Sequence, residues 1–385
     1  MLFNTGVPPI IRVVLGLGLV VLVCTITLGA RQNTEDFSAF VPLPREVVSP
    51  ADNPTTPEKV ELGRLLFWDP ILSGAGDIAC ATCHHPDHAY TDGRDLPIGT
   101  GGRGLGPKRT FHGKAPIVKR NSQTILNVAF NGLVDLATPS DPSSAPMFWD
   151  VRAKSLEAQA LGPIESLEEM RGPGVPEGSG AAAAVARIAR VREYRERFAR
   201  VFGGDDPVSV TNLGKAIAAF ERTLITPDSR FDRYMRGDKT ALRGAELLGM
   251  AAFRDRGCLG CHKGPMFSDY QVHVLGVGDH PMLPVPDTGV GERSAFRTPT
   301  LRNIGLTAPY MHNGMLDLLP TAVGFYQVIG NSNPRLGRGQ LDPLLNQVNV
   351  RSQLYDLVDF LLTLEGPFDK TIPARVPSGL KVGGR

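Results

Sequence analysis

Two short runs of cysteine and histidine are the residues of this chain best suited to chemistry. In each run two cysteines are separated by two residues, and a histidine follows the second cysteine at once. The six residues are Cys80, Cys83, His84, Cys258, Cys261 and His262. This spacing is the attachment signature of a c-type haem, because both thiols bond to the porphyrin and the imidazole reaches the iron. A zinc site would need four ligands around each run, and a redox dithiol does not require the histidine. The chain is therefore predicted to carry two covalently bound haems.

The bulk composition limits the remaining function classes. The chain has 385 residues, 42% of them hydrophobic and 21% charged, which is typical of a soluble globular protein with two or three domains. A formal net charge of +2 excludes a nucleic-acid binder that depends on bulk charge. Four of the five cysteines belong to the haem runs, so no disulfide framework is expected.

The N-terminal segment predicts export. Residues 13–30 carry no charge and lie between Arg12 and Arg31. This length falls between the apolar core of a signal peptide and a membrane span. Residues 1–34 are therefore expected to be either a cleaved signal peptide or a retained membrane anchor. Haem is attached to such runs outside the cytoplasm, so the haem-bearing part is expected in the periplasm.

The elements that must position the two runs are predicted to be mostly helices and long loops. Thr56 and Pro57 are typical of a helix start, and further helices are expected over 181–202, 211–224 and 352–364. Strand-like alternation is nearly absent. Loops rich in glycine and proline are long enough to be functional, and they span 95–118, 138–146, 171–180 and 276–294.

The chain also repeats itself loosely. A Leu-Leu-containing helical segment precedes each haem run, at 61–67 and 244–248, and the segment 122–127 is similar to 298–303. The predicted fold class is mainly α, with two haem domains related by internal duplication. The expected boundaries are 35–225 for the N-terminal domain, 226–370 for the C-terminal domain and 371–385 for a tail.

From about Thr56 to Gly366 the chain resembles the bacterial dihaem cytochrome c peroxidase and MauG family. The segments that carry the resemblance, in family order, are 62–70, 148–150, 156–160, 231–234 and 309–314. The resemblance implies two cytochrome-c-like domains with one haem on either side of their boundary. It further implies that hydrogen peroxide is reduced at the N-terminal haem and that the C-terminal haem handles electrons.

The same resemblance nominates residues for the peroxide site. Cleavage of peroxide needs a group that moves a proton between its two oxygens, and the family uses a glutamate ten residues after a glutamine. Gln159 and Glu169 stand in this relation, with Glu168 as the neighbouring competitor. A solvated carboxylate at a helix end is the alternative reading of Glu169.

Two more residues match positions near the family's N-terminal haem. Trp149 stands ten residues before Gln159 and matches the tryptophan between the two haems, although a buried indole can also be plain core packing. His112 lies close to the place of a family histidine that caps the N-terminal iron until activation. It could equally face solvent or line the pocket. His85 and His88 are expected to be surface histidines.

The C-terminal iron departs from the peroxidase pattern. Fourteen residues after His312, where the peroxidases have a ligating methionine, stands Tyr326, as in MauG. A phenolate stabilises ferric iron, whereas a thioether favours the ferrous state. The alternative is that Tyr326 only packs and that Met311, Met315 or water is the ligand.

A calcium ion between the domains is also implied by the family. The matching donors are the Asn121 side chain and the backbone carbonyls of Thr307 and Pro309, all hard oxygens of the kind that calcium binds.

Three functions remain open on the sequence. The first is a periplasmic peroxidase that takes electrons from a small cytochrome c or cupredoxin. The second is a MauG-like enzyme that uses a peroxide-generated high-valent dihaem state to oxidise a protein or another substrate; Tyr326 favours it. MauG, however, passes electrons through a surface tryptophan two residues before its second haem run, where this chain has Arg256. The third is a non-enzymatic dihaem electron carrier. Peroxide-dependent haem chemistry is the expectation, in a monomer or a homodimer.

Overall fold

The computed structural model describes residues 36–112, 117–328 and 333–384. Residues Phe37–Arg385 form one compact unit. The segment 1–34, predicted to be a signal peptide or an anchor, lies outside the described residues. Within the described ranges, no helix combines the length and the apolar character that crossing a membrane requires.

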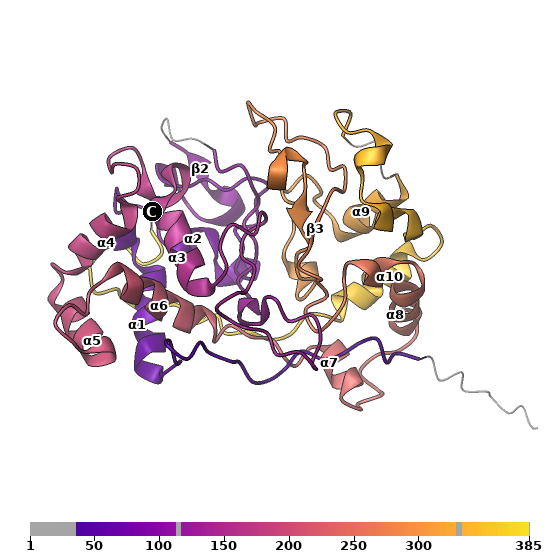
Figure 1. Ribbon diagram of the computed structural model, residues 1–385, viewed down its shortest axis with the longest axis horizontal. Helices are drawn as coiled ribbons and strands as arrows, with labels where there is room; N and C mark the ends of the chain where they lie inside the picture. The colour runs from indigo at the N-terminus through magenta and orange to yellow at the C-terminus, as the bar shows by residue number, and fades with distance from the viewer. Residues whose placement is uncertain (1–35, 113–116, 329–332, 385) are drawn as a thin grey trace, which may run out of the picture. The chain divides into compact units, whose positions relative to one another are not determined.

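The chain is mainly helical, as predicted (Figure 1). The α-helices of the described residues are α1 (Pro57–Trp68), α2 (Cys80–Cys83), α3 (Leu156–Glu165), α4 (Gly180–Ile188), α5 (Arg192–Phe202), α6 (Val210–Glu221), α7 (Arg230–Met235), α8 (Ala245–Asp255), α9 (Leu319–Gly324) and α10 (Leu354–Leu362). The strands are two residues long and form two antiparallel pairs: β1 (Gly102–Arg103) with β2 (Thr110–Phe111), and β3 (Val272–His273) with β4 (Phe296–Arg297).

Three of the predicted helices are present, with small shifts at their ends. α1 begins as expected, because the Thr56 side chain accepts a hydrogen bond from the Lys59 amide and Pro57 occupies the first turn. α6 begins just before the predicted residue 211, where the Ser209 side chain accepts from the Asn212 amide. α10 lies within the predicted range 352–364.

The prediction of one helix over 181–202 is wrong. The chain turns at Val191, which is extended, and two helices result, α4 and α5. Ile188, Tyr194 and Phe198 are all completely buried in one core cluster. On a continuous helix Ile188 would point roughly 100° away from the other two side chains, so the turn is what lets all three share a core.

The two halves of the chain are built around similar helix pairs. The α1–α6 pair precedes residue 226 and the α8–α10 pair follows it, and the two pairs lie on opposite sides of the molecule in Figure 1. Each pair closes on a glycine: a Cβ on Gly63 would collide with the carbonyl of Ala216, and one on Gly249 with the carbonyl of Asp356. Internal duplication remains a prediction, and this correspondence agrees with it.

Each end of the compact unit packs into the opposite half. Phe40 is buried against Phe231, Phe253 and Phe360 of the C-terminal half. The predicted tail returns to the N-terminal half, and the chain ends beside α2 in Figure 1. There the Thr82 hydroxyl, inside the first haem run, donates to the carbonyl of Gly383 at 2.7 Å. The domain boundaries thus stay a prediction, but Val376 and Val382 pack into the core beside the first run, and Gly384 pairs with Ile78.

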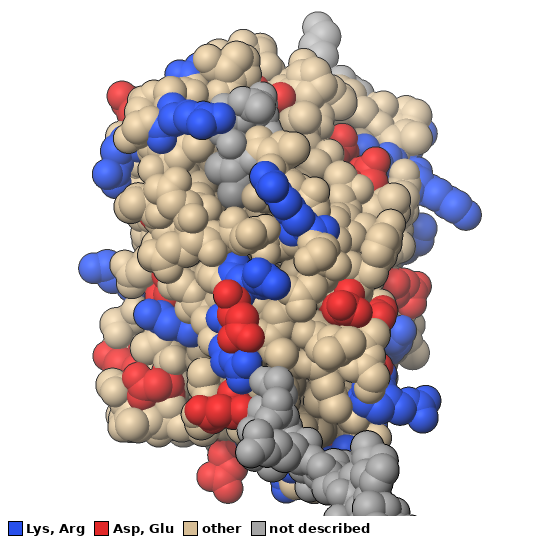
Figure 2. Space-filling model, turned by 90° about the vertical axis from the view of Figure 1, so that its right-hand side faces the viewer, with Lys and Arg blue, Asp and Glu red and all other residues tan. Residues whose placement is uncertain are grey.

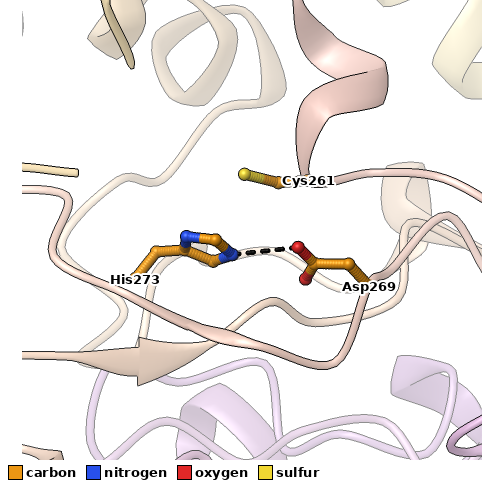
Figure 3. A group of neighbouring side chains, drawn as sticks. All are labelled: Cys261, Asp269 and His273. Atoms are coloured by element: carbon orange, nitrogen blue, oxygen red, sulfur yellow. Dashed lines mark hydrogen bonds and ion pairs between the residues drawn. The ribbon is translucent and has the colours of Figure 1, made fainter. Parts of the chain in front are cut away.

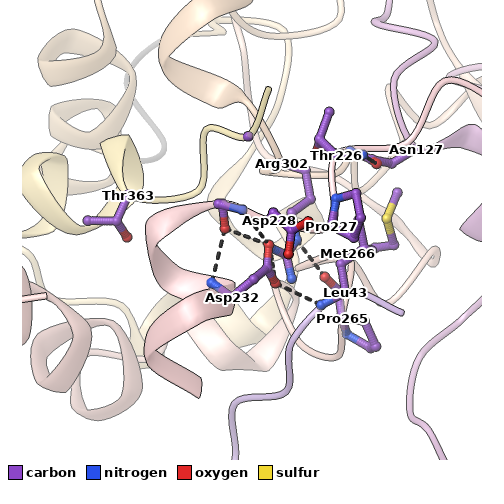
Figure 4. Close-up of polar contacts among 12 residues, drawn as sticks. Leu43, Asn127, Thr226, Pro227, Asp228, Asp232, Pro265, Met266, Arg302 and Thr363 are labelled. Atoms are coloured by element: carbon purple, nitrogen blue, oxygen red, sulfur yellow. Dashed lines mark hydrogen bonds and ion pairs between the residues drawn. The ribbon is translucent and has the colours of Figure 1, made fainter. Parts of the chain in front are cut away.

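A buried ion pair ties four separate segments of the chain together (Figure 4). Arg302 Nη1 lies 2.9 and 3.0 Å from the two carboxylate oxygens of Asp232, and both side chains are completely buried. Asp232 Oδ1 also accepts from the Leu43 amide, while Arg302 Nε donates to the carbonyl of Pro265, just after the second haem run. The pair therefore fixes the chain that follows His262.

Removing one member of this pair is expected to destabilise the holoprotein strongly. Asp232→Ala should lower the free energy of unfolding by about 3–5 kcal/mol, because it leaves a buried guanidinium uncompensated. Asp228→Ala is the matched control, since the Asp228–Arg45 pair is exposed and should contribute about 1 kcal/mol or less. Urea unfolding curves measure both values, and equal losses would show that the buried pair has no special role.

Candidate dihaem active site

One cavity of about 750 Å³ is lined by both haem runs. All six cysteine and histidine residues of the runs face it: Cys80, Cys83, His84, Cys258, Cys261 and His262. The first two cysteines come from α2, and Cys258 begins a short 3₁₀ turn after α8. Two segments far apart in the sequence therefore meet at one hollow space.

The two histidines are prepared in the same way to bind iron. His84 Nδ1 lies 3.0 Å from the carbonyl of Tyr90, and His262 Nδ1 lies 2.9 Å from the carbonyl of Phe267. Burial lowers the pKa of both imidazoles and so favours the neutral ring. A neutral ring that donates through Nδ1 presents the Nε2 lone pair to a metal. Both runs thus fit a covalently bound haem with an axial histidine.

The predicted peroxide-site residues line the same cavity. Gln159 lies on α3, which the Ser155 side chain caps at its N-terminus. Glu169 lies on a π-helical turn, Leu167–Arg171, and the Thr100 amide donates to its backbone carbonyl. Burial raises the pKa of the Glu169 carboxyl to about 7, against the opposing field of Arg152. This group can exchange a proton near neutral pH.

Glu169 and Tyr326 interact electrostatically with different haem runs. The Glu169 carboxyl acts on the thiols of Cys80 and Cys83, where burial is the larger cause of a raised pKa. The phenol of Tyr326 has its pKa raised by burial first, and then by the thiols of Cys258 and Cys261. Glu169 therefore lies beside the first haem run and Tyr326 beside the second.

Trp149 is held by both halves of the chain. Its side chain is buried, and its indole Nε1 donates to the carbonyl of Asn121 at 3.0 Å. Its own carbonyl accepts from the Arg297 amide of β4 at 2.8 Å. The indole thus lines the cavity at the place where the two halves bond to one another.

His312 occupies the corresponding loop of the C-terminal half. The two loops are each closed by a bridge between residues six apart, Met147 with Ala153 and Tyr310 with Leu316. The His312 carbonyl accepts from the Asn121 amide, as Trp149 accepts from Arg297. Its ring stacks on Phe296 at 3.7 Å, and burial lowers its pKa to about 4. In the sequence, His312 stands out only as the residue from which the offset to Tyr326 is counted.

This correspondence explains why the two ends of the cavity differ. Tyr326 follows His312 by fourteen residues, and the residue fourteen after Trp149 is Pro163. Both line the cavity. Proline has no side-chain ligand atom, so the N-terminal half offers no counterpart to the phenol. Comparison of the two offsets would have identified Pro163 from the sequence. Of the alternatives to Tyr326, Met311 also lines the cavity, whereas Met315 is 40% exposed.

The structure does not bring His112 to the cavity. It follows β2, is exposed, and its Nε2 lies 2.9 Å from the Thr110 hydroxyl. A capping role at the iron would need this segment to move, and it stays a prediction. The expectation that His85 lies on the surface is wrong, because its ring is buried against Trp68 and accepts from the Asp87 amide.

The three predicted calcium donors belong to the lining of the cavity, and calcium itself stays a prediction. Asn121, Thr307 and Pro309 all line it. The Asn121 amide nitrogen donates to the Arg94 carbonyl at 2.7 Å, which leaves its Oδ1 for a cation. One amide and two backbone carbonyls are hard oxygen donors, so the set fits calcium.

One further group combines side chains of metal-ligand type, Cys261, Asp269 and His273 (Figure 3). His273 Nε2 lies 3.0 Å from Asp269 and its Nδ1 lies 2.6 Å from Asp342. Hydrogen bonding, chiefly to Asp269, raises the His273 pKa to about 11. Both ring nitrogens thus bond to carboxylates, and Cys261 belongs to the second haem run. The three side chains form a charged hydrogen-bonded group beside that run, and none of them is left to bind another metal.

Comparison with known proteins agrees with the site. A family model described as di-haem cytochrome c peroxidase matches residues 57–240. The methylamine utilization protein MauG of Methylophilus methylotrophus is 32% identical over 335 residues, 84% of this chain and 87% of that protein. The cytochrome c551 peroxidase of Nitrosomonas europaea is 35% identical over 351 residues, 89% of this chain and 91% of that protein.

Solved structures give the same result. A MauG-like protein associated with microbial copper homeostasis has a TM-score of 0.67 at 27% identity, over 87% of this chain and 95% of that one. The diheme peroxidase BthA of Burkholderia thailandensis has a TM-score of 0.62 at 25% identity, over 89% of this chain and 94% of that one. With both haem runs on one cavity, these likenesses show that the chain belongs to the dihaem cytochrome c peroxidase family that includes MauG.

Proposed function

We propose that this protein is an exported peroxidase that reduces hydrogen peroxide to water at the haem of the first run. Electrons reach that haem through the haem of the second run, from a small cytochrome c or cupredoxin. The observation that carries the proposal is the asymmetry of the cavity. Glu169 acts on the thiols of the first run, where a proton-transfer group is needed, and Tyr326 acts on those of the second. Pro163, at the position in the N-terminal half that corresponds to Tyr326, offers no ligand atom to the cavity that it lines.

The haem, when bound, supplies an iron that binds peroxide and exchanges electrons. The carboxylate of Glu169 accepts a proton from one peroxide oxygen and returns it to the other as the oxygen–oxygen bond breaks. The Gln159 amide, which also lines the cavity, orients the peroxide by hydrogen bonding. Two electrons from the donor and two protons from solvent complete the conversion of one peroxide to two waters.

Trp149 fits a bridging role between the haems. It is buried, faces the cavity and is bonded to both halves of the chain. A rigidly held indole between two redox centres shortens the gap that electrons must cross. The hydrogen bond of the indole to Asn121 fixes the orientation of the ring, which a tryptophan that only fills the core would not need.

A MauG-like activity is the second candidate, and Tyr326 is the observation that favours it. Two MauG proteins are among the relatives. Against it, Arg256 stands at the position of the tryptophan that would pass electrons to a protein. Its Nε donates to the Gln353 side chain at 2.7 Å, so Arg256 has a structural role at this position.

Donor docking is expected to rely on more than charge. On the face shown in Figure 2, which is the right-hand side of Figure 1, cationic and anionic side chains are interspersed over a largely uncharged surface. Exposed apolar side chains on α8 and α10, Leu248, Tyr355 and Leu362, lie in this half of the chain. A cytochrome c or cupredoxin with an apolar contact surface suits such a face. The periplasm, where such donors occur, is the proposed location, and calcium the proposed third cofactor.

Electron counting tests the proposed function. The holoprotein is mixed with reduced cytochrome c or cupredoxin, and peroxide is added in measured amounts. Oxidation of two donor molecules per peroxide is the expected result. A MauG-like enzyme would consume peroxide without these donors while it oxidised a protein, and an electron carrier would leave the peroxide intact.

A further inference from the structure

Glu221 is a buried carboxyl that the reaction described above does not use. It is the last residue of α6, is 5% exposed and lines the cavity. Its Oε2 atom has no hydrogen-bond partner among the described residues. The adjacent guanidinium of Arg222 is directed to Glu157, with contacts of 2.7 and 3.0 Å. Within the described part of the chain Glu221 therefore forms no salt bridge, and Arg222 acts on it only through its field.

The corresponding position in the other half is a leucine. Phe220 and Phe360 both lie against the close-contact glycines of their helix pairs, Gly63 and Gly249. The residue after Phe220 is Glu221, and the residue after Phe360 is Leu361, which is also buried and also lines the cavity. A leucine can be buried at this position without loss of hydration energy, whereas burial of a carboxyl costs free energy. The N-terminal half thus has a titratable group that the architecture does not demand.

Glu221 lies close to the attachment point of the first haem, because its neighbour Phe220 is part of the core cluster against which Cys80 packs. Burial, and after it the field of Glu221, raises the pKa of the Cys80 thiol to about 12. Burial raises the pKa of Glu221 itself to about 8; Arg222 opposes this shift and Glu157 adds to it. In the holoprotein Cys80 is a thioether and does not titrate. The charged groups that act on Glu221 are then Arg222 and Glu157, which neutralise one another, and the haem.

We propose that Glu221 takes up a proton when an electron reaches the haem of the first run, and releases it when that electron leaves. The electron comes from the donor protein and the proton from solvent, so the net charge of the pocket is unchanged. An added negative charge favours the protonated form of a nearby carboxyl, and the same linkage makes the electron easier to accept at low pH. On oxidation the proton becomes available for water formation. The inference takes from the proposed function only that this haem reacts with peroxide.

The midpoint potential of the first haem, measured against pH in the holoprotein, tests the proposal. The potential is expected to fall with rising pH by up to about 59 mV per unit, the value for one proton per electron. Glu221→Gln, which keeps the size of the side chain, and Glu221→Leu, which copies the other half, should flatten this slope. Glu196→Gln, an exposed carboxyl on α5 paired with Arg192, should leave it intact.

A wild-type potential independent of pH, or an unchanged slope in both Glu221 variants, would overturn the proposal. If the variants fail to retain haem, redox-difference infrared spectra of the wild type decide. A protonated-carboxyl band that appears on reduction both in the wild type and in Glu169→Gln is the expected result. Its absence, or its loss in Glu169→Gln, is contrary. No peroxide is used, so failure here leaves the proposed peroxidase activity standing. Failure of electron counting would likewise leave this linkage intact.

Discussion

Glu169→Gln is expected to slow the reaction of the holoprotein with hydrogen peroxide by about 10²-fold or more, the usual effect of losing a general acid–base group. The amide has nearly the same size but cannot accept and return a proton. Both haem spectra and the unfolding midpoint should stay close to those of the wild type, because Glu169 faces the cavity and not the core. Stopped-flow measurement of the peroxide reaction gives the rate.

The pH dependence of the same rate provides an internal check. Glu169 must be ionised to accept a proton, and burial raises its pKa to about 7. The wild-type rate should therefore fall as pH decreases below about 7, and the residual rate of Glu169→Gln should not. Glu168→Gln is the matched control, one residue away on the same turn, and should lose less than tenfold. A larger loss in Glu168→Gln than in Glu169→Gln would transfer the role to Glu168.

Tyr326→Phe is expected to change the C-terminal haem and leave the N-terminal haem nearly untouched. A phenolate ligand stabilises ferric iron, so its loss should raise the potential of that haem. Axial ligands set haem potentials over a range of about 0.8 V, so a rise on the order of 0.1 V is expected. The low-spin EPR signal should shift as well, while the high-spin signal of the other haem persists.

Tyr310→Phe is the control for this substitution. Tyr310 also lines the cavity, and its hydroxyl donates to the carbonyl of Ile304 at 3.0 Å. Tyr310→Phe removes a phenolic hydroxyl from the same half of the chain, as Tyr326→Phe does, and both EPR signals should remain as in the wild type. If Tyr326→Phe also leaves both signals and both potentials unchanged, Tyr326 packs without binding iron. Met311 is then the next candidate ligand, because it faces the cavity.

The parts of the fold that the sequence predicts are those set by local chemistry. The start of α1 follows from the hydroxyl of Thr56 and the ring of Pro57, which act within one turn. The break at Val191 does not follow from local pattern, since it depends on which side chains must reach a common core. His85 was misplaced for the same reason: its burial comes from Trp68, seventeen residues earlier.

The candidate site divides in a similar way. The resemblance to the family, with its fixed spacings, predicted Gln159, Glu169, Trp149 and Tyr326, and the structure brings all four to one cavity. Glu221 was missed because nothing around it in the sequence separates it from an ordinary helix-end carboxylate. Only the packing of α1 on α6, and of α8 on α10, shows that its counterpart is Leu361. The return of residues 376–384 to the first haem run is likewise a product of long-range contacts.

The central claim is that peroxide reacts at an open iron beside Glu169 while the other iron keeps a protein ligand. The most direct measurement is an EPR and optical titration of the holoprotein with peroxide, in the ferric and half-reduced states. One high-spin and one low-spin haem are expected, and the high-spin signal should respond to peroxide first. In Glu169→Gln this response should be about 10²-fold slower than in the wild type. Two low-spin haems that do not respond to peroxide in either state would contradict the account.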